Sequence, residues 1–371
     1  MIIAAALWLA AAEVCRPISL KTAPVHVLWR TESKVREIYR AGNTLVIQNL
    51  WGVSAVDADS GAVLWSYHLK NDSRPLAELA VLSDRVAVVD FNEIIFFALR
   101  RGEEIHRTKV ERFVARLAGP PLIAVMDNYR RVGSTMFALN PDGSIAARRI
   151  VRHVHLLTMS GDVAVAQLDR NPGEEWPTLY KLQGFDAVTL QPLWQIGGTI
   201  STEIQEIGGR PHIIETPWGE NPRPIDIRTG RLGPPIPKRE GRDEIWAAAT
   251  WEFETPTSTP GPRNEYASCE RARRNDPASG RPRWSVDLPF AVTATLRDGE
   301  TFYMFGSADA QHHFLVAVDW SSGRLLGAWS GMPDIHTMVK FKGRIIGGTF
   351  DELMSVSLQG ERASRPHETV K

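Results

Sequence analysis

The chain of 371 residues lacks several features that would assign it to a specialised class. Its only cysteines, Cys15 and Cys269, are too few for a disulfide framework or a four-thiolate metal site. The 43 Lys and Arg residues balance 43 Asp and Glu residues, so no excess positive charge is available for nucleic acid or an anionic membrane. No uninterrupted apolar run reaches the roughly 18 residues of a membrane-spanning helix. These absences leave an ordinary globular protein, either of two or three domains or of one large repeat assembly.

The N-terminus begins with an apolar run, MIIAAALWLAAA, over residues 1–12. Its length and the small residues at its end are typical of the hydrophobic region of a secretion signal. Residues 1–20 are therefore predicted to be an export signal, which would place the mature chain in the periplasm or cell envelope. Because no Lys or Arg precedes the run, a retained N-terminal segment on a cytoplasmic protein stays open. Lipidation at Cys15 is disfavoured, since Ala12, Glu13 and Val14 form a poor lipoprotein box.

A degenerate repeat extends along most of the chain. Its clearest copies are residues 55–65 (AVDADSGAVLW), 186–194 (DAVTLQPLW) and 276–284 (DPASGRPRW), in which Asp and Trp are eight positions apart. A partial copy at 226–230 has lost its Trp, and another at 319–323 is followed by a Trp two residues late. Positions equivalent to the Asp, at 57, 99, 140, 186, 226, 276, 319 and 358, recur about every 43 residues. The motif residues are Asp57, Gly61, Trp65, Asp186, Trp194, Asp226, Gly230, Asp276, Gly280, Trp284, Asp319, Gly323 and Trp329, with Trp29 as an orphan.

Each repeat unit has the pattern of short strands separated by turns. Apolar runs such as 45–48, 86–89 and 163–166 precede second strands such as 52–56, and no long helical period is present. Units of about 40–45 residues with four short strands are typical of β-propeller blades. We therefore expect an all-β, eight-bladed propeller of four-stranded antiparallel blades over residues 25–360, followed by a polar tail at 361–371. Seven blades are the alternative, if the weak unit near Asp226 merges with a neighbour.

The orphan strand at 25–30 (VHVLWR) is predicted to close the ring, because the last unit lacks a strand that carries Trp. Closure would also remove a free sheet edge. In each turn, the Asp is expected to accept hydrogen bonds from turn amides, and the Gly to take a positive φ. The tryptophans are expected to pack against the neighbouring blade, which accounts for 12 Trp against 6 Tyr. These docking tryptophans are Trp29, Trp65, Trp194, Trp284 and Trp329.

The motif resembles the pyrroloquinoline-quinone (PQQ)-type repeat, whose usual form is similar to Ala-Leu-Asp-x-x-Thr-Gly-Lys-x-x-Trp. The resemblance extends from about Val25 to Gly360 and is closest in three units. It implies an eight-bladed propeller with one of two functions. One group comprises periplasmic dehydrogenases that oxidise alcohols or sugars through PQQ and calcium. The other comprises non-catalytic propellers, including the outer-membrane-protein assembly lipoprotein, which bind other proteins.

The residues favour the non-catalytic group. The alcohol dehydrogenases of the family carry a disulfide between adjacent cysteines, whereas this chain has no adjacent cysteines and no Cys-x-x-Cys-His haem attachment. None of the family's cofactor residues can be assigned to a position here. We therefore predict a scaffold that binds a protein or peptide, with no catalytic residue, cofactor, metal or nucleic-acid partner. The alternatives are a PQQ- and calcium-dependent dehydrogenase and a cytoplasmic interaction propeller.

Three irregular stretches are candidate partner-binding loops. Residues 251–263 are rich in Pro and Thr, which argues against a central strand, and a basic run at 270–274 follows. The stretches 169–178 and 217–224 each contain a tryptophan. Exposed Trp and Arg are typical of binding hot spots, and flexible hairpin tips are the alternative interpretation. The candidate residues are Trp176, Trp218, Trp251, Arg263, Arg273 and Arg274.

Two histidine pairs are weaker candidates. His153 and His155 would share one face of a strand, but without carboxylate or thiolate neighbours they are interpreted as solvated or core residues. His312 and His313 are interpreted as loop residues. No phosphate loop, zinc-protease, serine-hydrolase or calcium-loop motif is present in the sequence.

Overall fold

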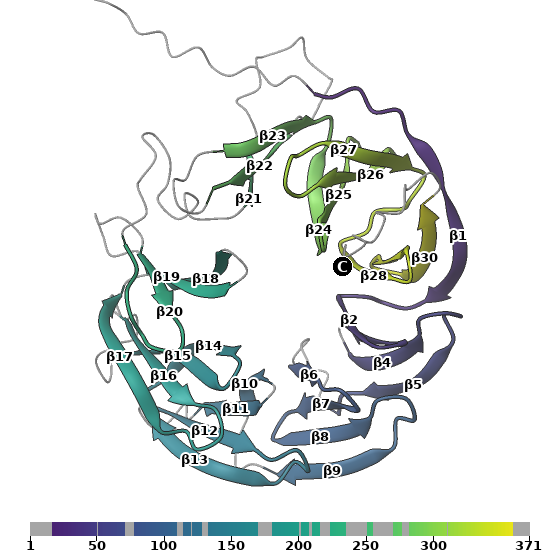
Figure 1. Ribbon diagram of the computed structural model, residues 1–371. Coiled ribbons are helices and arrows are strands. Elements are labelled where there is room, and N and C mark those ends of the chain that lie inside the picture. The colour runs from purple at the N-terminus through teal and green to yellow at the C-terminus, as the bar shows by residue number, and fades with distance from the viewer. Residues whose placement is uncertain are drawn as a thin grey trace, which may run out of the picture.

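The computed structural model describes residues 17–49, 51–70, 78–109, 114–119, 121–127, 133–169, 180–199, 202–207, 210–215, 223–234, 251–254, 270–276, 282–309 and 311–358. Every regular element in these ranges is a β-strand, which confirms the all-β prediction. The sheets are arranged in a ring around a central opening (Figure 1). The described residues contain no helix of the length and apolarity needed to cross a bilayer.

Consecutive strands pair antiparallel within each sheet. Four sheets have four strands each: β2 (Glu37–Ala41), β3 (Thr44–Asn49), β4 (Gly52–Asp57) and β5 (Val63–His68); β6 (Leu79–Val81), β7 (Arg85–Asp90), β8 (Glu93–Ala98) and β9 (Glu104–Lys109); β10 (Val114–Ala118), β11 (Leu122–Asp127), β12 (Ser134–Leu139) and β13 (Ile145–Val151); β14 (Val154–Ser160), β15 (Val163–Asp169), β16 (Tyr180–Asp186) and β17 (Pro192–Thr199). Two sheets have three described strands: β18 (Thr202–Ile207), β19 (Arg210–Glu215) and β20 (Arg223–Asp226); β21 (Trp251–Glu254), β22 (Glu270–Asn275) and β23 (Pro282–Leu288). Among the described strands, the unit near Asp226 forms a sheet of its own, β18–β20.

The N-terminal strand β1 (Ala23–Glu32) joins the last two sets of strands. These sets are β24 (Ala291–Asp298), β25 (Thr301–Ser307), β26 (His313–Asp319) and β27 (Leu325–Ser330), then β28 (Thr337–Phe341), β29 (Arg344–Gly348) and β30 (Glu352–Leu358). β1 pairs antiparallel with β30 from Val25↔Leu358 to Glu32↔Glu352. It is therefore the fourth strand beside β28–β30, where the purple and yellow ribbons meet in Figure 1.

The hydrophobic core lies in layers between successive sheets. One layer joins Val46 and Val53 of the first sheet to Val88 and Ile95 of the second, and these four side chains are fully buried. Strands in the middle of a sheet are buried on both faces, as in β12, whereas outer strands such as β13 alternate between exposed and half-buried positions. Each sheet therefore depends on its neighbours for burial, since a fully buried aliphatic side chain contributes about 1.5–3 kcal/mol.

The repeated turn connects the third and fourth strands of a sheet. In the first copy, Oδ1 of Asp57 accepts hydrogen bonds from the amides of Asp59 (3.1 Å) and Ser60 (3.0 Å). The Gly61 amide donates to the Asp57 carbonyl oxygen (2.8 Å), and Gly61 has a φ of 75°. The turns at 186, 226 and 319 use their Asp in the same way.

The second turn shows that one aligned position was off by one residue. The Gly102 amide donates to the Ala98 carbonyl oxygen, and the Ala98 amide donates to the Glu103 carbonyl oxygen (both 2.9 Å). Ala98, and not Leu99, is therefore the equivalent of Asp57. Neither residue has a carboxylate, so the sequence of this degenerate copy did not fix the alignment.

A tryptophan from each of three outer strands packs on the turn glycine of the next sheet. A Cβ atom added at Gly102 would lie 2.4 Å from Cγ of Trp65, and the same contact joins Gly230 to Trp194 and Gly323 to Trp284. The indole Nε1 donates to a carbonyl oxygen of that turn, from Trp65 to Leu99 (2.9 Å), and likewise from Trp194 to Ile227 and from Trp284 to Trp320 (both 2.8 Å). We call this paired contact the Trp–Gly latch.

At three other places, the Trp–Gly latch is incomplete or is replaced by a different contact. Trp29 packs on Gly61, but its buried Nε1 has no hydrogen-bond partner among the described residues. Trp329 folds its ring back over Gly327 and is 1% exposed. The turn at Asp186 has Leu190 at the glycine position, with a φ of 57° and 1% exposure. The preceding outer strand β13 contains no tryptophan, so the space is filled by the leucine itself.

The latch predicts a large difference between two glycine substitutions. Gly102→Ala forces a Cβ into the Trp65 ring and should destabilise the chain by about 2–4 kcal/mol, whereas Gly42→Ala adds a Cβ in open space and should cost only about 1 kcal/mol. Both glycines have a positive φ, 69° and 60° respectively, so the backbone strain is matched. Urea unfolding measures both changes, and equal losses would contradict the latch.

The turn carboxylates predict acid sensitivity. Hydrogen bonds from Ser321 and Ser322 lower the pKa of Asp319 to about 2 from 3.8. Because this pKa is lower in the folded than in the unfolded state, its stabilisation is present above about pH 4 and is lost as the pH falls through about 2. Asp319→Asn should therefore lower the free energy of unfolding by about 2 kcal/mol at pH 7, and by steadily less between pH 4 and pH 2. Urea titrations across this range test it, and a constant difference would argue against the charge as the cause.

Candidate partner-binding face

The innermost strands β2, β6 and β10 border the central opening (Figure 1). A pocket of about 680 Å³ is lined by residues of these strands and of the turns that follow β6 and β10. The dehydrogenase alternative would require carboxylates and several cations to converge here. The described lining contains one cationic side chain, Arg40, whose Nη1 donates to the Lys340 carbonyl oxygen (2.5 Å). Among the described residues, no three His, Cys, Asp or Glu side chains gather closely enough to hold a metal ion. The donors of this pocket do not fit PQQ with calcium.

The candidate partner-binding residues that can be placed in the structure lie on strands and not in loops. Trp176, Trp218 and Arg263, like Gly280 and both cysteines, lie outside the described residues. Trp251 does not begin an irregular loop, because residues 251–254 form the edge strand β21, with Trp251 opposite Arg274. The Pro- and Thr-rich sequence begins only after this strand, and an edge position is compatible with it.

Arg273 and Arg274 lie on strand β22, not in a loop. Arg273 is 9% exposed, so its side chain is almost wholly buried. Nη1 of Arg274 donates to the Trp320 carbonyl oxygen (2.6 Å), and its guanidinium lies 4.5 Å from the centre of the Trp320 ring. Arg297 covers the same ring at 4.4 Å, and burial lowers the pKa of Arg274. These contacts bind Arg274 into the layer beneath the latch of Trp284.

The histidine pairs do not form a metal site in the described part of the chain. The rings of His153 and His155 lie edge to face, 4.7 Å apart. His312 occupies a turn, where its Nδ1 lies 2.7 Å from Asp309, and His313 begins β26 and stacks on Phe305. The loop interpretation therefore describes His312 but not His313, whose side chain is only 12% exposed.

Exposed aromatic residues mark one face of the ring. Trp51, Phe91 and Phe350 are 41%, 52% and 71% exposed. Each lies in the hairpin between the second and third strands of its sheet, β3–β4, β7–β8 and β29–β30. Because strand direction alternates, these hairpins and the connections between sheets lie on the side opposite the repeated Asp turns. We call this side the tip face, and sequence reasoning missed it because single aromatic residues in turns have no periodic pattern.

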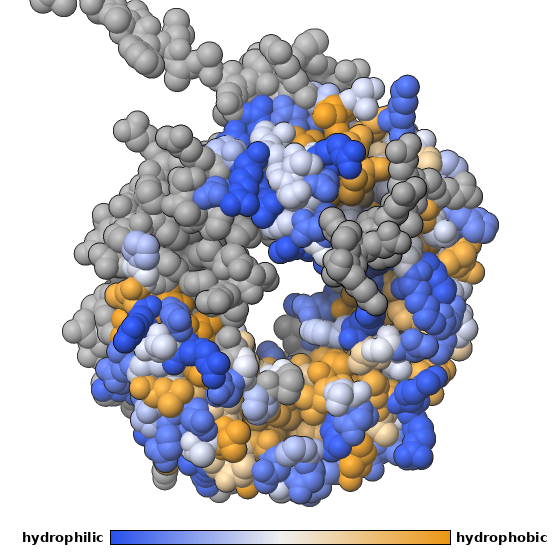
Figure 2. Space-filling view, in the orientation of Figure 1, coloured by the Kyte–Doolittle hydropathy of each residue, from blue (hydrophilic) through white to orange (hydrophobic). Residues whose placement is uncertain are grey.

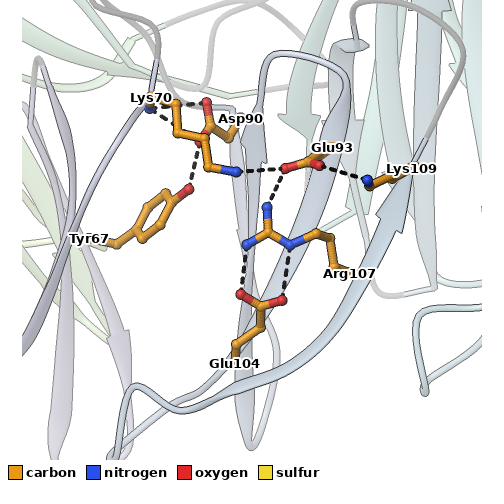
Figure 3. A network of polar contacts seen from close by, with 7 residues as sticks. All are labelled: Tyr67, Lys70, Asp90, Glu93, Glu104, Arg107 and Lys109. Atoms are coloured by element: carbon orange, nitrogen blue, oxygen red, sulfur yellow. Dashed lines mark hydrogen bonds and ion pairs between the residues drawn. The ribbon is translucent and has the colours of Figure 1, made fainter.

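The base of the Phe91 hairpin is held by a network of polar contacts (Figure 3). Buried Asp90 accepts hydrogen bonds from Tyr67 Oη (2.6 Å) and from the Lys70 amide (3.2 Å). On the other side of the tip, Glu93 accepts from Lys70 Nζ (3.1 Å) and from Arg107. The Lys70 bond lowers the pKa of Glu93, and burial raises that of Tyr67. The network ties the tip to the outer strand of the preceding sheet.

Phe91 itself has a strained backbone conformation. Its φ is 59°, a region that a bulky residue rarely adopts and that costs on the order of 1 kcal/mol or more. Leu190 has the same strain but is fully buried, so its burial offsets the cost. Phe91 is half exposed, so burial offsets less of its cost than it does at Leu190. An exposed aromatic ring on a strained but rigidly anchored turn is suited to contact with another molecule.

Hydrophobic side chains also gather over β6–β8 and β10–β11 beside the central opening (Figure 2). A pocket of about 440 Å³ lies among the β6–β7, β10–β11 and β12–β13 turns, and its lining includes the apolar side chains of Leu82, Leu122 and Leu139. Its cation, Arg85, is already paired with Asp84 (2.8 Å). This pocket offers apolar contact without a free charged group in its described lining.

Known structures share the architecture of the ring. No protein-family model and no characterised protein sequence matches the chain. Among solved structures, the Europium-containing methanol dehydrogenase aligns with a TM-score of 0.59 at 11% identity, over 90% of this chain and 93% of that one. BamB from Moraxella catarrhalis gives 0.54 at 10% identity, over 90% and 99%. Quinohemoprotein alcohol dehydrogenase ADHIIG from Pseudomonas putida HK5 gives 0.57 at 11%, over 96% and 80%.

The chain has the fold of a PQQ-type β-propeller. This confirms the fold that the repeat predicted. The likeness is structural and extends to dehydrogenases and to BamB alike, so it establishes the propeller architecture and not an activity.

The two strained residues predict different responses to glycine. Phe91→Gly removes the strain together with the buried half of the ring, and these effects oppose each other, so the free energy of unfolding should stay within about 1 kcal/mol of the parent value. Leu190→Gly removes the same strain but empties a buried site, and should cost about 2–4 kcal/mol. Urea unfolding of both variants makes the comparison. A loss of similar size at Phe91 would mean that its ring serves stability.

Proposed function

We propose that this PQQ-type propeller is a non-enzymatic scaffold that binds a protein or peptide partner through its tip face. The observation that carries the proposal is Phe91, an aromatic ring that is exposed, strained and anchored at both ends of its hairpin. Aromatic side chains contribute most to protein interfaces when their supports are rigid, because little ordering is then lost on binding.

The repetition of the feature supports the same function. Trp51, Phe91 and Phe350 come from three sheets that are consecutive around the ring, and the pairing of β1 with β30 makes the last sheet a neighbour of the first. In the sequence, Trp176 lies between β15 and β16, and Trp218 between β19 and β20, which are connections of the same kind. We expect these two tryptophans to extend the aromatic surface.

We also propose that the scaffold acts in the cell envelope and carries no PQQ or calcium. The apolar run at residues 1–12 supports export, and BamB provides a structural precedent for this fold outside the dehydrogenases. The dehydrogenase alternative rests on the other structural relatives and on no residue set of this chain.

Partner binding is tested by paired surface variants. The tip variant removes the three tip aromatics by combining Trp51→Ala, Phe91→Gly and Phe350→Ala. The control variant removes three exposed apolar side chains of outer strands (52%, 47% and 50% exposed) by combining Val63→Ala, Ile105→Ala and Leu193→Ala. Tagged full-length chains are incubated with an envelope extract, and retained proteins are quantified by mass spectrometry. We expect at least one protein to fall fivefold or more with the tip variant only, and to bind the purified parent chain directly. Equal recovery by all three chains would refute the tip face as the binding site.

The cofactor alternative is tested by titration. PQQ is added to the purified chain with calcium, with europium and without metal, and tryptophan fluorescence is recorded. We expect no saturable quenching and no dye-linked oxidation of alcohols or sugars, because the described lining of the 680 Å³ pocket offers one cationic side chain. Saturable, metal-dependent binding with turnover would make the chain a dehydrogenase.

A further inference from the structure

A separate pocket of about 380 Å³ lies on the tip face where the last sheet meets the first. Its walls come from the β1–β2 connection, the β27–β28 connection and the β29–β30 hairpin. The lining residues are Lys34, Val35, Arg36, His336, Phe350 and Asp351. We call it the seam pocket, and its volume falls in the range of pockets that bind ligands.

One wall of the seam pocket is an organised aromatic surface. Phe350 is 71% exposed, and its ring stacks on that of His336 with centres 4.6 Å apart. His336 is fixed in turn, because its Nε2 donates to the Val35 carbonyl oxygen (2.8 Å). The exposed ring is therefore held in place before any ligand binds, which lowers the entropic cost of a contact.

The other wall carries positive charge. Lys34 and Arg36 are exposed on either side of Val35, which is 3% exposed and anchors the segment. Neither side chain forms an ion pair with another described residue, in contrast to Lys70 and Arg107 on the same face. Asp351 is the single carboxylate in the lining, so the cations exceed the anions by one.

We infer that the seam pocket binds an acidic peptide segment, in which a carboxylate contacts Lys34 and Arg36 while a neighbouring apolar side chain packs on Phe350. This inference rests on the proposed function and names the chemistry of the partner. A concave site with an aromatic wall suits an extended peptide better than a flat lipid surface, which would need a projecting apolar ridge with cations around it. Two exposed cations beside an aromatic ring provide the complementary charge and the apolar anchor.

The test measures fluorescence anisotropy of defined peptides on the full chain. The probe is an acetylated and amidated octapeptide with two glutamates flanking a phenylalanine, and its controls carry lysine in place of glutamate or alanine in place of phenylalanine. We expect the acidic probe to bind with a Kd on the order of 100 μM and both control peptides to bind at least tenfold more weakly. Phe350→Ala should weaken the acidic probe about fivefold.

Charge reversal locates the contact. Lys34→Glu with Arg36→Glu should weaken the acidic probe at least tenfold, and the milder Lys34→Gln with Arg36→Gln should weaken it by a smaller factor. Lys21→Glu with Arg324→Glu makes the same change in net charge at exposed positions outside the pocket and should alter the Kd less than twofold. Thermal melts by circular dichroism check that each variant is folded.

Three outcomes would overturn the inference. The acidic probe could fail to bind at millimolar concentration, or the two charge reversals could weaken it equally, which would indicate general electrostatic attraction. Vesicles of phosphatidylglycerol could bind in place of the peptide and depend on Lys34 and Arg36, which would assign the pocket to a membrane. The proposed function is judged separately, by the envelope-extract experiment. If an envelope protein binds the parent chain and the Lys34 and Arg36 reversal variant but not the tip variant, the tip face is still the binding site, and only the inference about the seam pocket fails.

Discussion

The contact between an indole ring and the turn glycine of the next sheet is the constraint on which the rest of this propeller depends. A turn residue with a Cβ would meet the ring at 2.4–2.6 Å, so ring and turn can approach only if the turn residue is glycine. The indole N–H then bonds to a carbonyl oxygen of the same turn and fixes the ring along its length. Each latch therefore sets the distance and the rotation between two sheets. The apolar layers between sheets pack well only at that spacing, since interiors tolerate few voids.

The seam between the last sheet and the first is held in a different way. Trp29 packs on Gly61 without the indole hydrogen bond within the described residues. Charged contacts are present there instead: Asp59 of the first turn accepts from Lys342 Nζ (2.6 Å) and from Arg344 Nη2 (2.8 Å) of the last sheet. These groups are partly exposed, so screening by salt weakens them more than it weakens an indole bond in the core. The cohesion of the seam therefore depends on solvent conditions, and the seam also contains the seam pocket.

The repeat allowed the propeller to be predicted from the sequence, because its Asp and Gly predict a tight turn and its Trp predicts a contact with the next sheet. Apolar runs such as 45–48 and 163–166 coincide with β3 and β15, which are buried on both faces. The innermost strands were not located, since β2 and β6 have only five and three residues, and β2 mixes polar with apolar side chains. Arg273 and Arg274 were misplaced for a related reason, because a basic run resembles a loop. Arg273 is nevertheless buried, and Arg274 is held by the Trp320 carbonyl oxygen and the Trp320 ring.

The tip face could not be read from the sequence because its signal is conformational. A phenylalanine in a turn is unremarkable until its φ and exposure are known, and Leu190 shows that the same strain can serve packing alone. The two residues lie on opposite faces of the propeller. Leu190 is in an Asp turn and is buried, whereas Phe91 is in a hairpin of the tip face and is half exposed. The latches make the ring rigid, and a rigid ring can hold an unfavourable turn without local unfolding. The contacts between neighbouring sheets therefore stabilise the propeller enough for the tip face to expose aromatic side chains in fixed positions.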